Sequence, residues 1–133
     1  MTNYFKRVVA LTFFTFSASL MFAQAVFQFE EETFEFGDVV EGTQVKHTFK
    51  FKNVGDEPLQ ILRVNTTCGC TVPEWPTAPI QPNEEGAIDI IFDSNNRVGK
   101  TSRQIYIQSN AVLPEGILGG RYPLKIEGNV IAK

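Results

Sequence analysis

The sequence predicts an all-β domain, an antiparallel β-sandwich of seven or eight strands. Apolar and polar residues alternate in short runs, and Gly, Pro, Asn and Asp separate these runs. No stretch keeps the helical spacing of apolar residues for three turns. The chain is rich in Phe, Val, Ile and Thr, which favour strands. Many short strands with frequent turns are typical of two packed sheets.

Residues 1–25 carry the pattern of a signal peptide. Lys6 and Arg7 precede an uncharged apolar run at 8–22, and Ala23-Gln24-Ala25 fits a cleavage site after either alanine. The apolar run is too short for a transmembrane helix, which needs about 20 residues. We therefore expect an exported protein, periplasmic or extracellular, with no membrane contact after cleavage. The alternative is an uncleaved N-terminal anchor.

The mature domain is expected to be residues 26–133, which is long enough to fold without a disulfide framework. Loss of Lys6 and Arg7 changes the formal charge from -3 to -5. This balance argues against nucleic acid as a partner, because nucleic-acid binding needs a basic surface.

The first strands are predicted around Phe27 and Phe29, and around Phe34 and Phe36. The acidic run at 30–32 between them indicates an exposed kink between two edge strands, or alternatively a negative binding face. Turns are expected at Gly37-Asp38 and Glu41-Gly42, on either side of Val39-Val40.

Gln44–Asn53 shows the clearest alternation and predicts a strand buried on one side, with Val45, His47, Phe49 and Phe51 inward. A turn at 53–58 and a strand at 59–64 follow, and that strand leads into the two cysteines.

Prolines at every third residue, from Pro73 to Pro82, predict an extended crossing between the sheets, held to the core by Trp75 and Ile80. A proline-rich ligand for an aromatic groove is the alternative reading. The remaining strands are expected at 87–92, 102–109 and 121–131, with these inward positions: Ile88, Ile90, Phe92, Ile105, Ile107, Tyr122, Leu124, Ile126, Gly128 and Val130.

Several runs together resemble a known family. They are Phe-Glu-Phe-Gly-Asp-Val at 34–39, Phe-Lys-Phe-Lys-Asn-Val-Gly at 49–55, Pro58-Leu59 and Thr-Cys-Gly-Cys-Thr at 67–71. In this order they are similar to a family of secreted bacterial Ig-like domains of unknown function, and to the wider group of sandwiches related to the major sperm protein. The resemblance implies an Ig-like fold and an exported protein, and it implies no activity. The family usually has a Pro-Gly turn where this chain has residues 81–86.

Cys68 and Cys70 are the candidate functional pair, because residues at i and i+2 of an extended segment point to the same side. Four readings remain open. They are a disulfide that requires local bending, a soft-metal site for Cu(I), pairing with another exported protein, and simple burial as small hydrophobes. The first would give a readily reduced bond suited to redox exchange.

No catalytic residue is predicted, and no cofactor. The chain has one histidine, His47, which is expected to be a packed core residue, and it lacks a nucleophile elbow and a phosphate-binding loop. Weak thiol-disulfide exchange or copper handling through Cys68 and Cys70 is the alternative to a non-enzymatic role.

The stronger prediction is a protein-binding or envelope assembly module whose partner is another envelope or exported protein. The loop at 110–120 is unusually apolar, and Val112, Leu113, Ile117 and Leu118 are its candidate contact residues. These side chains would otherwise fold back and cap the end of the sandwich.

Overall fold

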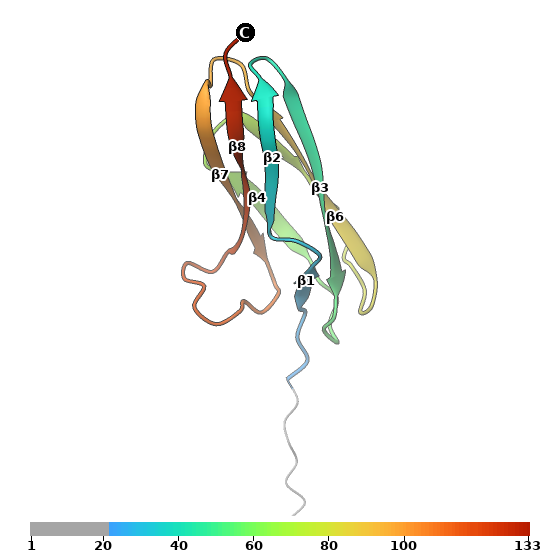
Figure 1. Ribbon diagram of the computed structural model, residues 1–133. Coiled ribbons are helices and arrows are strands. Elements are labelled where there is room, and N and C mark those ends of the chain that lie inside the picture. Colours follow the sequence, from blue (N-terminus) through green and yellow to red (C-terminus); the bar gives the residue numbers. More distant parts are fainter. Residues whose placement is uncertain (1–21) are drawn as a thin grey trace, which may run out of the picture.

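The computed structural model describes residues 22–133, which form two packed four-stranded sheets (Figure 1). The predicted all-β sandwich is confirmed. These residues contain no helix, and so none that is long and apolar enough to span a membrane. Residues 1–21, most of the predicted signal peptide, lie outside the described part. The strands are β1 (Phe27–Phe29), β2 (Thr33–Val40), β3 (Gln44–Asn53), β4 (Ile61–Thr66), β5 (Thr71–Glu74), β6 (Glu85–Asp93), β7 (Gly99–Ser109) and β8 (Tyr122–Ile131).

The strand order is β1-β3-β6-β5 in one sheet and β2-β8-β7-β4 in the other. All strand pairs are antiparallel except β2 and β8, which run parallel, so the expectation of a wholly antiparallel sandwich is wrong for this pair. The cause lies in the exposed residues 30–32, where the chain changes sheets without reversing direction. The predicted kink between two edge strands is confirmed at this crossing.

The core lies between the sheets and consists of side chains from alternating strand positions. On β3, Phe49 and Phe51 are buried, Val45 and His47 are half-buried, and the polar residues between them face solvent. Full burial of a large apolar side chain stabilises the fold by about 1.5–3 kcal/mol. The other predicted inward residues are also in place, and these are almost fully buried: Ile88, Ile90, Phe92, Ile105, Ile107, Leu124, Ile126 and Val130.

The turn predicted at Gly37-Asp38 is wrong, because both residues belong to β2. The pairing of β2 with β8 shifts by one residue between Glu35 and Gly37, which marks a β-bulge. Gly37 has a φ of 68°, in the left-handed region that glycine adopts at no steric cost. A glycine in a bulge can have the same left-handed conformation as a glycine in a turn. The local sequence around Gly37 therefore does not distinguish the two structures.

The proline-rich crossing begins with a strand that the sequence did not predict. β5 includes Pro73 and pairs only with β6, so it is an edge strand, where a residue without an N–H is tolerated. Beyond β5, Trp75 packs against the core and Ile80 is buried, as predicted. Asn83 takes the place expected for glycine in the following turn, with a φ of 67° and a hydrogen bond of 3.0 Å from Glu84 N–H to the Gln81 carbonyl oxygen.

Asn53 is buried and connects three separate segments of the chain. Its Nδ2 donates to the carbonyl oxygens of Glu57 (2.7 Å) and Ile80 (3.0 Å). Its Oδ1 accepts hydrogen bonds from the N–H groups of Val26 (3.3 Å) and Gly55 (3.0 Å). All four hydrogen-bonding positions of the amide are used, which offsets the cost of burying it.

Candidate functional site

The two cysteines lie in the connection from β4, at the edge of one sheet, to β5, at the edge of the other. Their sulfurs form a disulfide, and the Cα atoms of Cys68 and Cys70 are 5.2 Å apart. An extended segment would place these atoms near the upper limit for a bridge, about 6.8 Å. The connection bends instead, with the N–H of Thr71 donating to the carbonyl oxygen of Cys68 over 3.4 Å. Of the four interpretations of Cys68 and Cys70 given above, the structure contains the first, a disulfide with local bending.

The two cysteines differ in exposure. Cys70 is 5% exposed and belongs to the core, while Cys68 is half-buried at its margin. The N–H of Asp93 donates to the Cys70 carbonyl oxygen (2.8 Å), and Thr66 Oγ1 donates to the Cys68 carbonyl oxygen (2.8 Å). A thiolate arriving from solvent would therefore meet Cys68 first, and displacement at that sulfur would release Cys70.

His47 lies beside residues 30–32, where the chain passes from one sheet to the other. Its ring stacks on Phe34 at a centroid distance of 3.7 Å, and its Nε2 faces the carboxylate of Glu31. Phe49 meets the same ring edge to face at 4.7 Å. This environment agrees with the prediction of a packed core histidine. Within residues 22–133, no group of three or more His, Cys, Asp and Glu side chains is arranged to hold a metal ion.

The connection between β7 and β8 forms a large loop at the lower end of the sandwich in Figure 1. Leu113 packs against the core, and Ile117 is also half-buried. Val112 is 43% exposed and Leu118 is 92% exposed. Of the four predicted contact residues, Leu113 thus turns toward the core, Ile117 is partly covered, and Val112 and Leu118 face solvent.

The base of this loop is fixed to the body of the domain. Asn110 donates from its N–H to the Gln60 carbonyl oxygen (3.2 Å) and from Nδ2 to the Pro58 carbonyl oxygen (2.9 Å). The N–H of Val112 donates to the carbonyl oxygen of Ala25 (2.9 Å). The base of the loop is thus fixed, and Leu118 is exposed beyond it.

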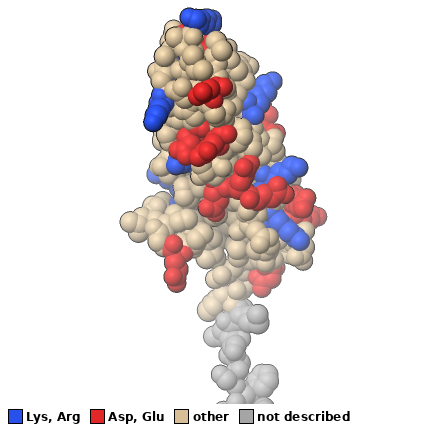
Figure 2. All heavy atoms as spheres, in the orientation of Figure 1, with Lys and Arg blue, Asp and Glu red and all other residues tan. Residues whose placement is uncertain are grey.

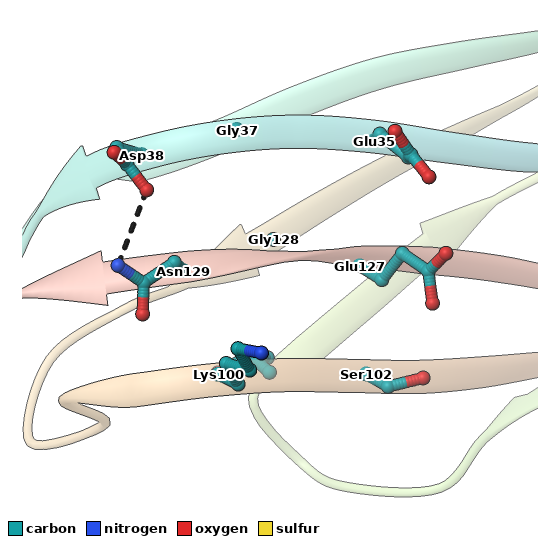
Figure 3. Close-up of a pocket in the computed structure, with 9 residues that line it drawn as sticks. Glu35, Gly37, Asp38, Lys100, Ser102, Glu127, Gly128 and Asn129 are labelled. Carbon is teal, nitrogen blue, oxygen red and sulfur yellow. Dashed lines mark hydrogen bonds between the residues drawn. The ribbon is translucent and has the colours of Figure 1, made fainter.

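A shallow hollow of about 510 Å³ lies over strands β2, β8 and β7, where the sequence predicted no site (Figure 3). The sequence signal for it is Gly37, where an added Cβ would meet no atom within 4 Å. Asn129 Nδ2 donates to Asp38 Oδ1 over 3.1 Å across the hollow. Figure 2 shows acidic side chains on this face of the molecule. The polar lining residues are Glu35, Asp38, Lys100, Thr101, Ser102, Glu127 and Asn129.

A second group of exposed aliphatic side chains lies at the opposite end from the loop. Val40 of β2 is in register with Ile131 of β8, and Val98 directly precedes β7 beside them. The three side chains are between 45% and 57% exposed. Apolar surface is therefore present at both ends of the sandwich.

A family model described as "Protein of unknown function (DUF1573)" matches residues 27–130. No curated protein matches the chain. Among solved structures, the chain is similar to a protein of unknown function from Porphyromonas gingivalis W83, with 20% identity and a TM-score of 0.67. The match covers 84% of this chain and 50% of the other, so this chain spans half the length of that protein.

Two further similarities concern the fold. The ASH/PapD-like domain 7 of human CEP192 matches with 9% identity and a TM-score of 0.64, over 83% of this chain and 88% of that domain. WR4, a Caenorhabditis elegans member of the MSP family, matches with 14% identity and a TM-score of 0.53, over 83% of this chain and all of the other. At these identities the matches establish the PapD-like and MSP-like sandwich fold.

Proposed function

Because the chain belongs to the DUF1573 family, whose description assigns no activity, we propose a function from its own surface: it is an exported protein-binding or assembly module. Its partner is another exported or envelope protein, and the contact is made by the tip of the β7–β8 loop. The observation that carries this proposal is Leu118, whose side chain is 92% exposed on a loop that is anchored at its base and through Leu113. Binding residues lie disproportionately on loops that a rigid scaffold positions, and Val112 is a second exposed aliphatic side chain on this loop.

The sheet edges are less suited to binding by strand addition. β1 has three residues, β2 and β4 each contain a register shift, and β5 contains Pro73. Short strands, bulges and prolines all interrupt the row of free backbone groups that an added strand would need. These features favour recognition through the loop over recognition through an edge.

The experiment places a photo-crosslinking amino acid at Glu115, an exposed position in the same loop, in the full chain expressed in its own cells. We expect a discrete crosslinked protein that disappears when Leu118→Asp is added. Val98→Asp, at the opposite end of the sandwich, is the matched control and should leave the crosslink unchanged. A crosslink that survives Leu118→Asp and is lost with Val98→Asp would contradict the loop as the contact site.

A second candidate function is thiol-disulfide exchange, and the unequal exposure of Cys68 and Cys70 favours it. A substrate dithiol would lose two electrons and two protons to become a disulfide, while the Cys68–Cys70 bond would be reduced to two thiols. In that reduced state the pair would also offer two soft ligands to Cu(I). Incubation of the oxidised protein with a dithiol peptide, followed by intact mass of both, tests this function. Unchanged masses over several hours would exclude the exchange.

A further inference from the structure

Residues 24–26 precede β1 but are built into the folded domain. The carbonyl oxygen of Gln24 accepts hydrogen bonds from the N–H groups of Asp56 (2.9 Å) and Glu57 (3.3 Å). The carbonyl oxygen of Ala25 accepts from Val112 (2.9 Å). This segment thus joins the turn at 53–58 to the base of the β7–β8 loop.

The packing around this segment is equally specific. Ala25 is 2% exposed and belongs to the core. Gly55 lies so close that a Cβ on it would be 2.0 Å from the Gln24 carbonyl oxygen and 2.9 Å from Ala25 Cα. A glycine is required here because any other side chain would displace the segment. The turn and the segment therefore form one packed unit.

We propose that the signal peptide is removed by hydrolysis of the Ala23–Gln24 peptide bond, so that Gln24 is the first residue of the mature protein. Water is consumed, the new carboxyl group stays on Ala23, and the new α-amine stays on Gln24. Cleavage after Ala23 has Met21 at the third position before the bond, where cleavage after Ala25 has Ala23, so the case for the earlier bond comes from the folded structure and not from the sequence pattern. Cleavage after Ala25 would remove a buried methyl group and all three of the carbonyl hydrogen bonds described above.

The new α-amine would also have a partner already in place. The backbone nitrogen of Gln24 donates to Asp56 Oδ1 over 2.6 Å. After cleavage this nitrogen becomes an ammonium group, so the contact becomes a charge-assisted hydrogen bond between opposite charges. Asp56 thus holds the mature N-terminus on the domain, next to the segment that supports the proposed binding loop.

This inference rests on export, which is part of the proposed function, and the first experiment separates the two. The full chain is expressed in its own cells, and the N-terminal peptide of the protein is identified by mass spectrometry. We expect a peptide that begins at Gln24. A peptide that begins at Val26 would overturn the inference and leave export intact. A chain that retains Met1 would overturn the inference, and its recovery from the cytoplasm would overturn export as well.

A second measurement tests the role of Asp56 in the mature protein. We expect Asp56→Asn to lower the melting temperature of the form that begins at Gln24 and to leave a form that begins at Val26 unchanged. Glu57→Gln is the matched control, because Glu57 contacts Gln24 through its backbone N–H. Equal shifts of the melting temperature in the two forms would overturn the pairing of the ammonium group with Asp56. So would a Gln24 found entirely as its cyclic lactam, because the lactam has no ammonium group.

Discussion

The ring of Phe36 occupies the space that a side chain at position 128 would need. A Cβ on Gly128 would lie 2.3 Å from Cδ2 of Phe36 and 2.7 Å from the Gly37 carbonyl oxygen. The aromatic ring of β2 thus packs over a glycine of β8, within the parallel strand pair. The absence of a side chain at position 128 therefore leaves the space that this ring fills.

Gly128→Ala is expected to lower the free energy of unfolding by about 1–3 kcal/mol, the usual cost of overpacking a core. Urea denaturation measures this change. Gly69→Ala is the control, since a Cβ at this exposed glycine meets no atom within 4 Å, and it should change stability by less than about 0.5 kcal/mol. Phe36→Leu combined with Gly128→Ala should recover part of the loss. Equal stability of Gly128→Ala and the wild type would contradict the packing.

Asn53→Ala is expected to lower the free energy of unfolding by about 3 kcal/mol. The substitution removes four hydrogen bonds, one buried and three part-buried, each of which contributes about 1 kcal/mol. Asn129→Ala, which removes one exposed hydrogen bond to Asp38, is the matched control and should have little effect. Similar denaturation midpoints for the two variants would refute the structural role of Asn53.

Reduction of the Cys68–Cys70 disulfide is expected to lower the free energy of unfolding by no more than about 2 kcal/mol, because the closed loop contains one intervening residue. The β-type circular dichroism spectrum should persist under reductant. After reduction, Cys68 in the Cys70→Ala variant should be alkylated faster than Cys70 in the Cys68→Ala variant, since Cys70 is the buried partner. Unfolding upon reduction at 25 °C would show that the bond has a larger structural role.

Stability is expected to fall at alkaline pH because of Tyr122. Burial, followed by the hydrogen bond to Glu32 and the negative charge of that carboxylate, raises the pKa of Tyr122. A pKa that is higher in the folded state contributes stability below the unfolded value, about 10, and loses it as the pH rises above that value. Denaturation midpoints at pH 8 to 11 measure this. Tyr122→Phe keeps the ring and should flatten the alkaline fall, and an identical fall in the variant would rule out this origin.

The sandwich was predictable because its strands alternate so regularly. The register of β3 places Phe49 and Phe51 inward as the pattern indicated, and the acidic run marked the crossing at 30–32. Alternation does not encode direction, however, so the parallel pairing of β2 with β8 had no sequence signal. β5 was missed because Pro73 argues against a strand, although an edge position tolerates it.

The candidate site was only partly predictable. Spacing alone indicated that Cys68 and Cys70 are neighbours, but the bend that lets them bond depends on contacts with Thr66 and Asp93. In the β7–β8 loop, the sequence could not separate Leu113 from Leu118, because burial of one and exposure of the other is decided by the fold of the loop. The packing of Ala25 against distant segments had no local signal either.

The parallel pairing of β2 with β8 has a mechanical consequence. Val40 at the end of β2 lies beside Ile131 at the end of β8, so both strands run toward the same end of the molecule, and the chain enters β2 at one end of the ladder and leaves β8 at the other (Figure 1). Tension applied between the two termini would first peel the short β1 from β3. It would then load the β2–β8 ladder in shear, so that all of its hydrogen bonds carry the force together. A domain connected in this way should resist stretching until that ladder breaks in a single step.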